Sequence, residues 1–204
     1  LRDYQECCDA DIRKKMRMEA LVKFMTLRSL SAKGKVKQAA DFIKVFLESA
    51  KPLIVFCSLH EIVDELCQLF PTAVRVTGRD SMQQKQSAVD AFQQGEANLI
   101  ICSIKAAGVG LTLTASSNVA FIEVPGTDGD CCQCEDRAHR IGQKDNVTCY
   151  YLMGRHTIDP VLYNIIQDKR MIANQILASE DDIPTDRIYF DQLVKAYCND
   201  FNQQ

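Results

Sequence analysis

The sequence predicts an α/β protein with a mainly parallel sheet. Two short apolar runs, Leu53–Cys57 and Leu99–Cys102, are continuous rather than alternating, which is typical of strands buried on both faces. Segments with the three-and-four spacing of amphipathic helices separate the predicted strands. Strands that alternate with helices form βαβ units, and their right-handed crossovers place the strands in parallel.

Length and composition exclude several classes of protein. A chain of 204 residues is long enough for one domain, with or without a helical appendage. Its 47% hydrophobic and 25% charged residues are typical of a globular core. No apolar run approaches the ~20 residues that cross a bilayer, and ten cysteines fall short of the ~8–10% of a disulfide scaffold. The first residue, Leu1, is not Met, so we expect the chain to be a piece of a longer protein.

Each element follows from the pattern of apolar residues and turn residues. Residues 1–30 predict a helix, Ser31–Gly34 a break, and the segment up to Leu47 a second helix. The five strands are predicted at 53–57, 73–76, 99–102, 119–124 and 147–153. The remaining helices are predicted at 62–70, 81–94, 130–140 and 159–177, the last with Asp159 as its N-cap. The expected parts are a helical extension at 1–32, a globular lobe at 33–178 and an acidic tail at 179–204 with a short helix over 190–197.

The net charge of −3 conceals two ends of opposite sign. Residues 13–44 carry ten Lys or Arg against two acids, whereas residues 180–204 carry six acids against two basic residues. The basic stretch indicates either a solvated helix surface or a face for nucleic acid, with Lys33, Lys35 and Lys37 as candidate contacts. Cys131 and Cys134 have CxxC spacing, but no second pair completes a zinc site. We therefore predict no metal site and a reducing compartment.

Three loops are candidates for chemistry, because ligands gather at the carboxyl ends of parallel strands. Thr77-Gly78 ends the second predicted strand and by itself also fits a simple turn. Ser103–Thr114 contains Gly108 and Gly110, which would let a phosphate or sugar approach the backbone, although a tight crossover explains them equally well.

The third loop, Gln133–Gln143, contains two arginines. On the predicted helix Arg137 and Arg140 are three residues apart, so both guanidinium groups would point the same way and could grip a triphosphate. The alternative is that they pair with Glu135 and Asp136 on a solvated helix. The chain has no GxxxxGKS/T loop and no DExH or DExD segment, so it lacks the cradle that holds a nucleotide.

In this order and spacing, the loops resemble the second RecA-like lobe of the SNF2 family of DNA-dependent ATPases, within helicase superfamily 2, over about residues 33–177. Gln133–Gln143 carries every fixed position of the family's motif VI, Q-x-x-D-R-x-x-R-x-G-Q. Ser103–Thr114 resembles motif V, in the form found in annealing helicases and in small bacterial or phage members. Pro52–Leu59 resembles motif IV, and Thr77-Gly78 with Ser81 resembles the segment after it.

The resemblance implies a RecA-like three-layer sandwich that carries half of an ATP site. In the family, ATP binds between two lobes, and the first lobe brings the phosphate loop and the acids that hold Mg²⁺. The second lobe supplies two arginine fingers, which correspond to Arg137 and Arg140. The implied ATP-binding residues are Gly108, Gly110, Gln133, Arg137 and Arg140, with Gln143 helping to hold the motif; the implied DNA-binding residues are Thr77, Gly78, Ser103 and Lys105.

Partners and location follow from the same resemblance. The expected partners are the first RecA-like lobe of the same protein and double-stranded or branched DNA, with no membrane. The isolated lobe is expected to be monomeric and inactive, in the cytoplasm of a bacterium or the nucleus of a eukaryote. Ile104, where most members have Thr, and Pro125–Gly129, in place of an aromatic-Asn-Pro segment, depart from the family. A stand-alone regulatory or nucleic-acid-binding module and an unrelated α/β enzyme remain as alternatives.

Overall fold

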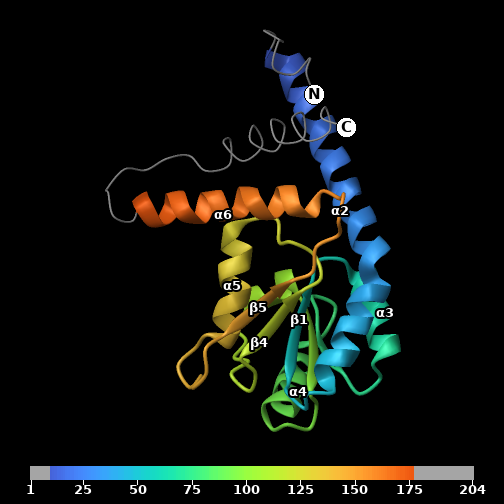
Figure 1. Cartoon of the computed structure of the whole chain (residues 1–204), viewed down its shortest axis with the longest axis vertical. Helices are drawn as coiled ribbons and strands as arrows, with labels where there is room; N and C mark the ends of the chain where they lie inside the picture. Colours follow the sequence, from blue (N-terminus) through green and yellow to red (C-terminus); the bar gives the residue numbers. More distant parts are fainter. Residues whose placement is uncertain (1–9, 177–204) are drawn as a thin grey trace. The chain divides into compact units, whose positions relative to one another are not determined.

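The computed structural model describes residues 10–176 (Figure 1). Within this range, the side chains of 10–14, 16, 17, 20, 107–109 and 172–176 are not described. The predicted acidic tail and its short helix lie outside the described residues. The chain divides into two compact units, Leu1–Ser31 with Gly154–Gln204 and Ala32–Met153. We call them the terminal unit and the central unit and describe each by itself.

The central unit is built on a parallel sheet of five strands in the order β2-β3-β1-β4-β5. The strands are β1 (Leu53–Cys57), β2 (Val74–Val76), β3 (Leu99–Ser103), β4 (Asn118–Phe121) and β5 (Thr148–Tyr151). The elements between them are α3 (His60–Leu69), α4 (Met82–Gln93), the 3₁₀ helix η1 (Ile104–Val109) and α5 (Asp128–Ala138), as Figure 1 shows. The predicted α/β class with a parallel sheet is confirmed.

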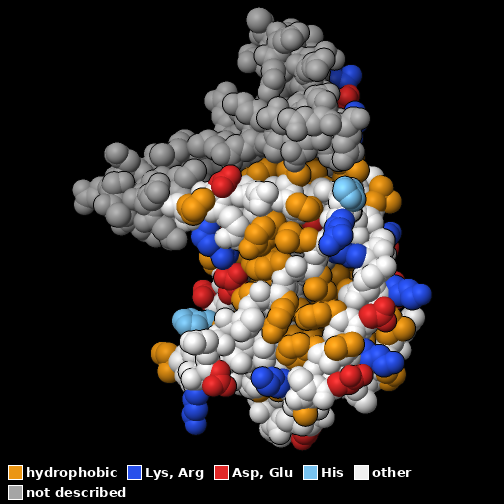
Figure 2. Space-filling view, viewed as in Figure 1, with side chains coloured by type: hydrophobic (Ala, Val, Ile, Leu, Met, Phe, Trp, Pro, Cys, Tyr) orange, Lys and Arg blue, Asp and Glu red, His pale blue; other side chains and the backbone are white. Residues whose placement is uncertain are grey.

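Alternate residues of the sheet point into two cores, which produces the three layers. Ile54 and Phe56 of β1 lie in a cluster with residues of α4 and α5. Leu53, Val55 and Cys57 lie in a second cluster with residues of α3 and of the preceding helix. A central parallel strand is covered on both faces, which is why its sequence is continuously apolar. Figure 2 shows hydrophobic side chains gathered in the middle of the face in view, with charged side chains around them.

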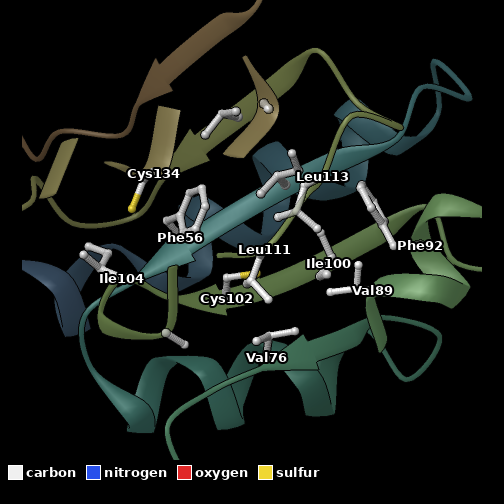
Figure 3. Packing of buried hydrophobic residues seen from close by; sticks show 14 of the residues in the cluster. Phe56, Val76, Val89, Phe92, Ile100, Cys102, Ile104, Leu111, Leu113 and Cys134 are labelled. Carbon is white, nitrogen blue, oxygen red and sulfur yellow. The ribbon is translucent and has the colours of Figure 1, made fainter. Parts of the chain in front are cut away.

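The first of these cores also anchors the segment after η1. Figure 3 shows Leu111 and Leu113 within the cluster, which they share with Ile100 of β3. Leu111 and Leu113 are buried and alternate with Thr112 and Thr114, which stay partly exposed. Because the side chains alternate as in a strand, the two leucines face the core and the two threonines face away from it, where other residues can contact them.

The break predicted at Ser31–Gly34 is wrong, because one helix, α2 (Ala10–Leu47), runs through it. Ala32, Val36 and Ile43 are buried at helical spacing, so the apolar face continues along the helix past the predicted break. Gly34 is exposed, and a glycine within a helix costs only ~1 kcal/mol relative to alanine. Burial of the apolar face outweighs that cost.

The described part of the terminal unit contains the predicted last helix, α6 (Asp159–Ile176). Asp159 is buried, and its Oδ2 accepts hydrogen bonds from Ser31 Oγ at 2.8 Å and from the Gly154 amide at 3.0 Å. The structure places Asp159 as the first residue of the helix rather than as its N-cap, a difference of one position. Among residues 10–176, no helix is long and apolar enough to span a membrane.

Candidate functional site

Two of the three predicted loops start at the carboxyl edge of the sheet. Val76 ends β2 and pairs with Cys102 of β3, while Cys57 ends β1 and pairs with Ser103. Thr77-Gly78 and the start of η1 therefore follow neighbouring strands at one edge, as the sequence predicts.

The third loop, Gln133–Gln143, leads away from this edge. After α5 ends, Gln143 contacts the carbonyl of Ser116, which precedes β4. The prediction that all three loops meet at the carboxyl edge is therefore wrong. The reason is topological, because α5 is a crossover that must return to the start of the next parallel strand, β5.

Arg140 lies beyond the helix on which the sequence places it. Helix α5 ends at Ala138, so the prediction of a helix to residue 140, with both arginines on one face, is wrong. Nη1 of Arg140 instead donates to the carbonyls of Gly110 and Leu111, both at 3.2 Å, and to Thr112 Oγ1 at 2.7 Å. A tertiary neighbour, motif V, sets the direction of this guanidinium group.

Gln143 fastens the end of motif VI to the same segment. Its Nε2 donates to the carbonyl of Ser116 at 2.9 Å and to those of Thr114 and Ala138 at 3.4 Å each. Its Oε1 accepts from the Lys144 amide at 2.9 Å. These contacts agree with the holding role that the resemblance implies for this glutamine. The other glutamine of the motif, Gln133, is exposed on α5.

Arg137 is partly buried near the end of α5, and its carbonyl accepts from the Leu113 amide at 2.9 Å. Its Nε is buried without a hydrogen-bond partner among residues 10–176. Within the same range, neither Arg137 nor Arg140 forms an ion pair. The described residues therefore do not show the alternative arrangement, in which Glu135 and Asp136 neutralise these arginines.

Glu135 is held by Tyr151 instead. The Tyr151 hydroxyl donates to Glu135 Oε1 at 2.6 Å, and burial together with this bond raises the pKa of Tyr151. The Tyr151 ring stacks on Phe121 with centroids 4.7 Å apart, and Phe121 stacks on Phe56 at 5.5 Å. The row of aromatic rings on β1, β4 and β5 thus holds Glu135 of α5, which lies two residues before Arg137.

Thr77 is fully buried, and its polar atoms are used within its own turn. Its amide and its hydroxyl each donate to Asp80 Oδ2 at 2.7 Å, and its Oγ1 accepts from the Arg79 amide at 3.2 Å. Arg79 Nη2 also donates to Asp64 Oδ1 at 2.6 Å, which lowers the pKa of Asp64. The turn therefore presents Gly78, which is exposed, rather than the threonine side chain.

The other candidates in motif V lie on η1 or at its ends. Ser103 is buried and caps η1, since its Oγ accepts from the Ala106 amide at 3.3 Å. Lys105 is exposed, and Gly108 lies within η1. Gly110 ends η1 at a φ of 71°, a left-handed conformation that favours glycine. Backbone geometry alone therefore explains Gly110, whereas the exposure of Lys105 leaves it available to a partner.

Glu123, which the sequence motifs do not mark, is a carboxylate at the carboxyl edge that is only 3% exposed. Its oxygens accept from the amide of Ser58 and, at 3.1 Å, from that of Leu59, where α3 begins. Both amides precede His60, the first residue of α3, and the N-cap, Leu59, has no capping side chain, so Glu123 fixes the segment that leads into the helix from another part of the chain. An acid inside the apolar run 120–124 is the signal that could have found it.

The basic residues singled out on α2 have contacts of their own. Lys33 forms an ion pair with Glu61 at 2.6 Å, and Lys35 Nζ donates to the Leu152 carbonyl at 2.6 Å. Lys37 is exposed. Two of the three candidates thus bind neighbouring parts of the central unit, which favours a structural role for them.

The buried cysteines behave as packing groups. Burial raises the pKa of Cys102 and of Cys57, and the negative charge of Glu123 raises that of Cys57 further. Both thiols therefore stay protonated and fill apolar space. Within residues 10–176, no cluster of three or more His, Cys, Asp or Glu could hold a metal ion.

Comparison with known proteins places this arrangement in a family. Residues 34–142, about half of the chain, match the family model of the helicase conserved C-terminal domain. The chain belongs to this helicase family. It is 35% identical over 179 residues to the SWI/SNF-related matrix-associated actin-dependent regulator of chromatin subfamily A-like protein 1 homolog of Caenorhabditis elegans, covering 82% of this chain and 25% of that protein. It is 30% identical over 166 residues to the DNA annealing helicase and endonuclease ZRANB3 of Homo sapiens, covering 78% of this chain and 15% of that protein.

The solved structures agree on the fold of this helicase lobe. The C-terminal part of the Fun30 ATPase domain superposes with a TM-score of 0.62 at 20% identity, covering 80% of this chain and 53% of that one. The chain is thus a C-terminal helicase lobe of the SNF2 family with a RecA-like fold, and it is a motor lobe rather than an unrelated α/β enzyme. It spans a quarter or less of the length of these curated relatives.

Proposed function

We propose that this helicase lobe is the second half of an ATP-dependent translocase on double-stranded DNA, with Arg137 and Arg140 as its arginine fingers. The observation that carries the proposal is the fastening of motif VI to motif V through Arg140 and Gln143. It holds two guanidinium groups on one loop with no acidic partner among the described residues. Such charges are suited to a triphosphate, whose γ-phosphoryl group needs positive charge as it is transferred.

The site needs a second half, which we assign to the first RecA-like lobe of the same protein. The described residues hold no carboxylate cluster for Mg²⁺, and the sequence has no phosphate loop, so both would come from that lobe. Bound there with ATP, Mg²⁺ would neutralise negative charge that develops on the phosphates. Gly108, Gly110 and Gln133 would face the same nucleotide. The isolated 204-residue chain would then be monomeric and hydrolyse no ATP.

The carboxyl edge is the proposed DNA-binding surface. Relatives named as DNA annealing helicases support double-stranded or branched DNA as the partner. Lys105 and Gly78 are exposed at this edge, whereas Thr77 and Ser103 shape their turns, so Lys105 and backbone N–H groups would contact the phosphates. Such contacts ignore sequence and weaken with salt. Relatives named as regulators of chromatin support a nuclear location.

The test is ATP turnover by the full two-lobe protein in the presence of double-stranded DNA. Arg137→Ala and Arg140→Ala are each expected to lower kcat by roughly 10³-fold or more, which is the contribution of an arginine finger. Arg155→Ala is the control, because Arg155 is exposed in the terminal unit and has no place in the proposed site. Turnover within tenfold of wild type in both finger variants would refute the assignment, and turnover by the 204-residue chain alone would contradict the two-lobe site.

A further inference from the structure

Ile141 is the most exposed of the large apolar residues in the described chain, with its whole surface in water. It stands inside motif VI, between Arg140 and Gly142. Exposed apolar side chains are common on folded proteins and need no explanation one by one. Ile141 differs because of the way the chain holds it.

A tight turn displays Ile141 at its tip. The Gln143 amide donates to the Arg140 carbonyl at 2.9 Å, which closes a turn of four residues. Gly142, the third residue, has a φ of 109°, and a positive φ at this place is typical of a type II turn and favours glycine. Ile141 therefore occupies the second position, where the chain reverses.

Both flanks of this turn are fastened to motif V. Arg140 binds Thr112 Oγ1 at 2.7 Å together with two carbonyls, and Gln143 Nε2 donates to the Thr114 carbonyl at 3.4 Å. Motif V is in turn anchored by Leu111 and Leu113 in the core. The tip is thus an apolar point that is ordered before any partner arrives, so its burial would not be offset by a further loss of chain entropy.

We propose that Ile141 is an interlobe docking residue, which enters an apolar recess of the first RecA-like lobe when the lobes close on ATP. This inference rests on the proposed function, because arginine fingers must face a nucleotide that the other lobe holds. Ile141 follows Arg140 directly in the turn, so a lobe that closes on a nucleotide beside Arg140 would also come near Ile141. The hollow of about 650 Å³ beside the turn is bordered by polar groups such as those of Gln143, Lys144 and Ser116, so it offers Ile141 no apolar cover.

Docking at this point would help the chemistry as well as the closure. An apolar contact beside the fingers excludes water from the phosphates, and electrostatic interactions are stronger where water is excluded. The expected partner is therefore an apolar recess at the rim of the nucleotide site, rather than a charged groove.

The experiment uses the full two-lobe protein, with a fluorescent donor and acceptor on the two lobes. Closure is titrated with a non-hydrolysable ATP analogue, and the KM for ATP is measured in DNA-stimulated turnover. Ile141→Ser is expected to weaken closure and raise KM roughly tenfold or more, which is the loss expected when a buried isoleucine side chain is removed. Ile141→Val keeps a branched apolar side chain and is expected to retain most of the closure.

Val45→Ser is the matched control, because Val45 is exposed on α2 and lies outside motif VI. Closure by Ile141→Ser that equals closure by Val45→Ser would overturn the docking role, and so would a loss in Ile141→Val as large as that in Ile141→Ser. Arg137→Ala and Arg140→Ala in the same assay separate the two proposals. If they abolish turnover while Ile141→Ser closes normally, the fingers stand and only the docking role falls.

Discussion

Replacement of Glu123 tests how the carboxyl edge of this lobe is held together. Glu123→Gln keeps the size of the side chain but replaces one acceptor oxygen with an NH₂ group. The amides of Ser58 and Leu59 now meet two carboxylate oxygens. In the variant, one of these N–H groups faces another donor, and the remaining bond loses its charge.

The magnitude follows from the contacts that change. A hydrogen bond to a charged group contributes ~1.5–3 kcal/mol. Because one bond is lost and one is weakened at the residues just before α3, Glu123→Gln is expected to lower the free energy of unfolding by ~2–3 kcal/mol. Urea unfolding of the purified chain, followed by circular dichroism, measures this quantity.

Glu61→Gln is the matched control, since Glu61 lies in the first turn of the same helix. Glu61 is exposed and pairs with Lys33 at 2.6 Å, and a surface ion pair contributes only ~0–1 kcal/mol. A cost below ~1 kcal/mol for Glu123→Gln, no larger than that of Glu61→Gln, would refute the conclusion that Glu123 holds the segment that leads into α3.

Two further predictions concern stability. Gly142→Ala is expected to lower the free energy of unfolding by ~1–3 kcal/mol, because the φ of 109° at this position is strained for alanine. The control, Gly129→Ala, lies within α5 and should be neutral or stabilising. Equal effects of the two substitutions in urea unfolding would contradict this prediction. Asp64 has a lowered pKa because Arg79 donates to it, so its contribution is present above the unfolded pKa of about 3.9 and is lost as pH falls through the lower folded pKa. The small difference in stability between wild type and Asp64→Asn should therefore shrink as pH falls below the unfolded pKa and vanish once Asp64 is protonated in the folded state; a difference that grows in acid would show that the sign is wrong.

The fold was predictable because its signals are local. Leu53–Cys57 and Leu99–Cys102 are continuously apolar, and the structure shows both as strands buried on two faces of a parallel sheet. Ser81, expected to begin a helix, caps α4 and forms a capping box with Gln84. The helix boundary after Arg137 was less predictable, because no glycine or proline marks the end of α5 and the terminating contacts come from motif V.

The sequence was sufficient for the class of fold, the order of its elements and the helicase family, since each depends on the spacing of residues along the chain. Only the tertiary structure decided what the polar groups contact. Arg140 binds carbonyls about 30 positions earlier, and Glu123 accepts from the amide of Leu59, 64 positions earlier. Such partners depend on how helices pack on the sheet, and packing is set by the burial of whole faces rather than by any local pattern. For the same reason, the sequence shows an ordinary isoleucine at position 141, and the fold makes it an exposed point held beside Arg140.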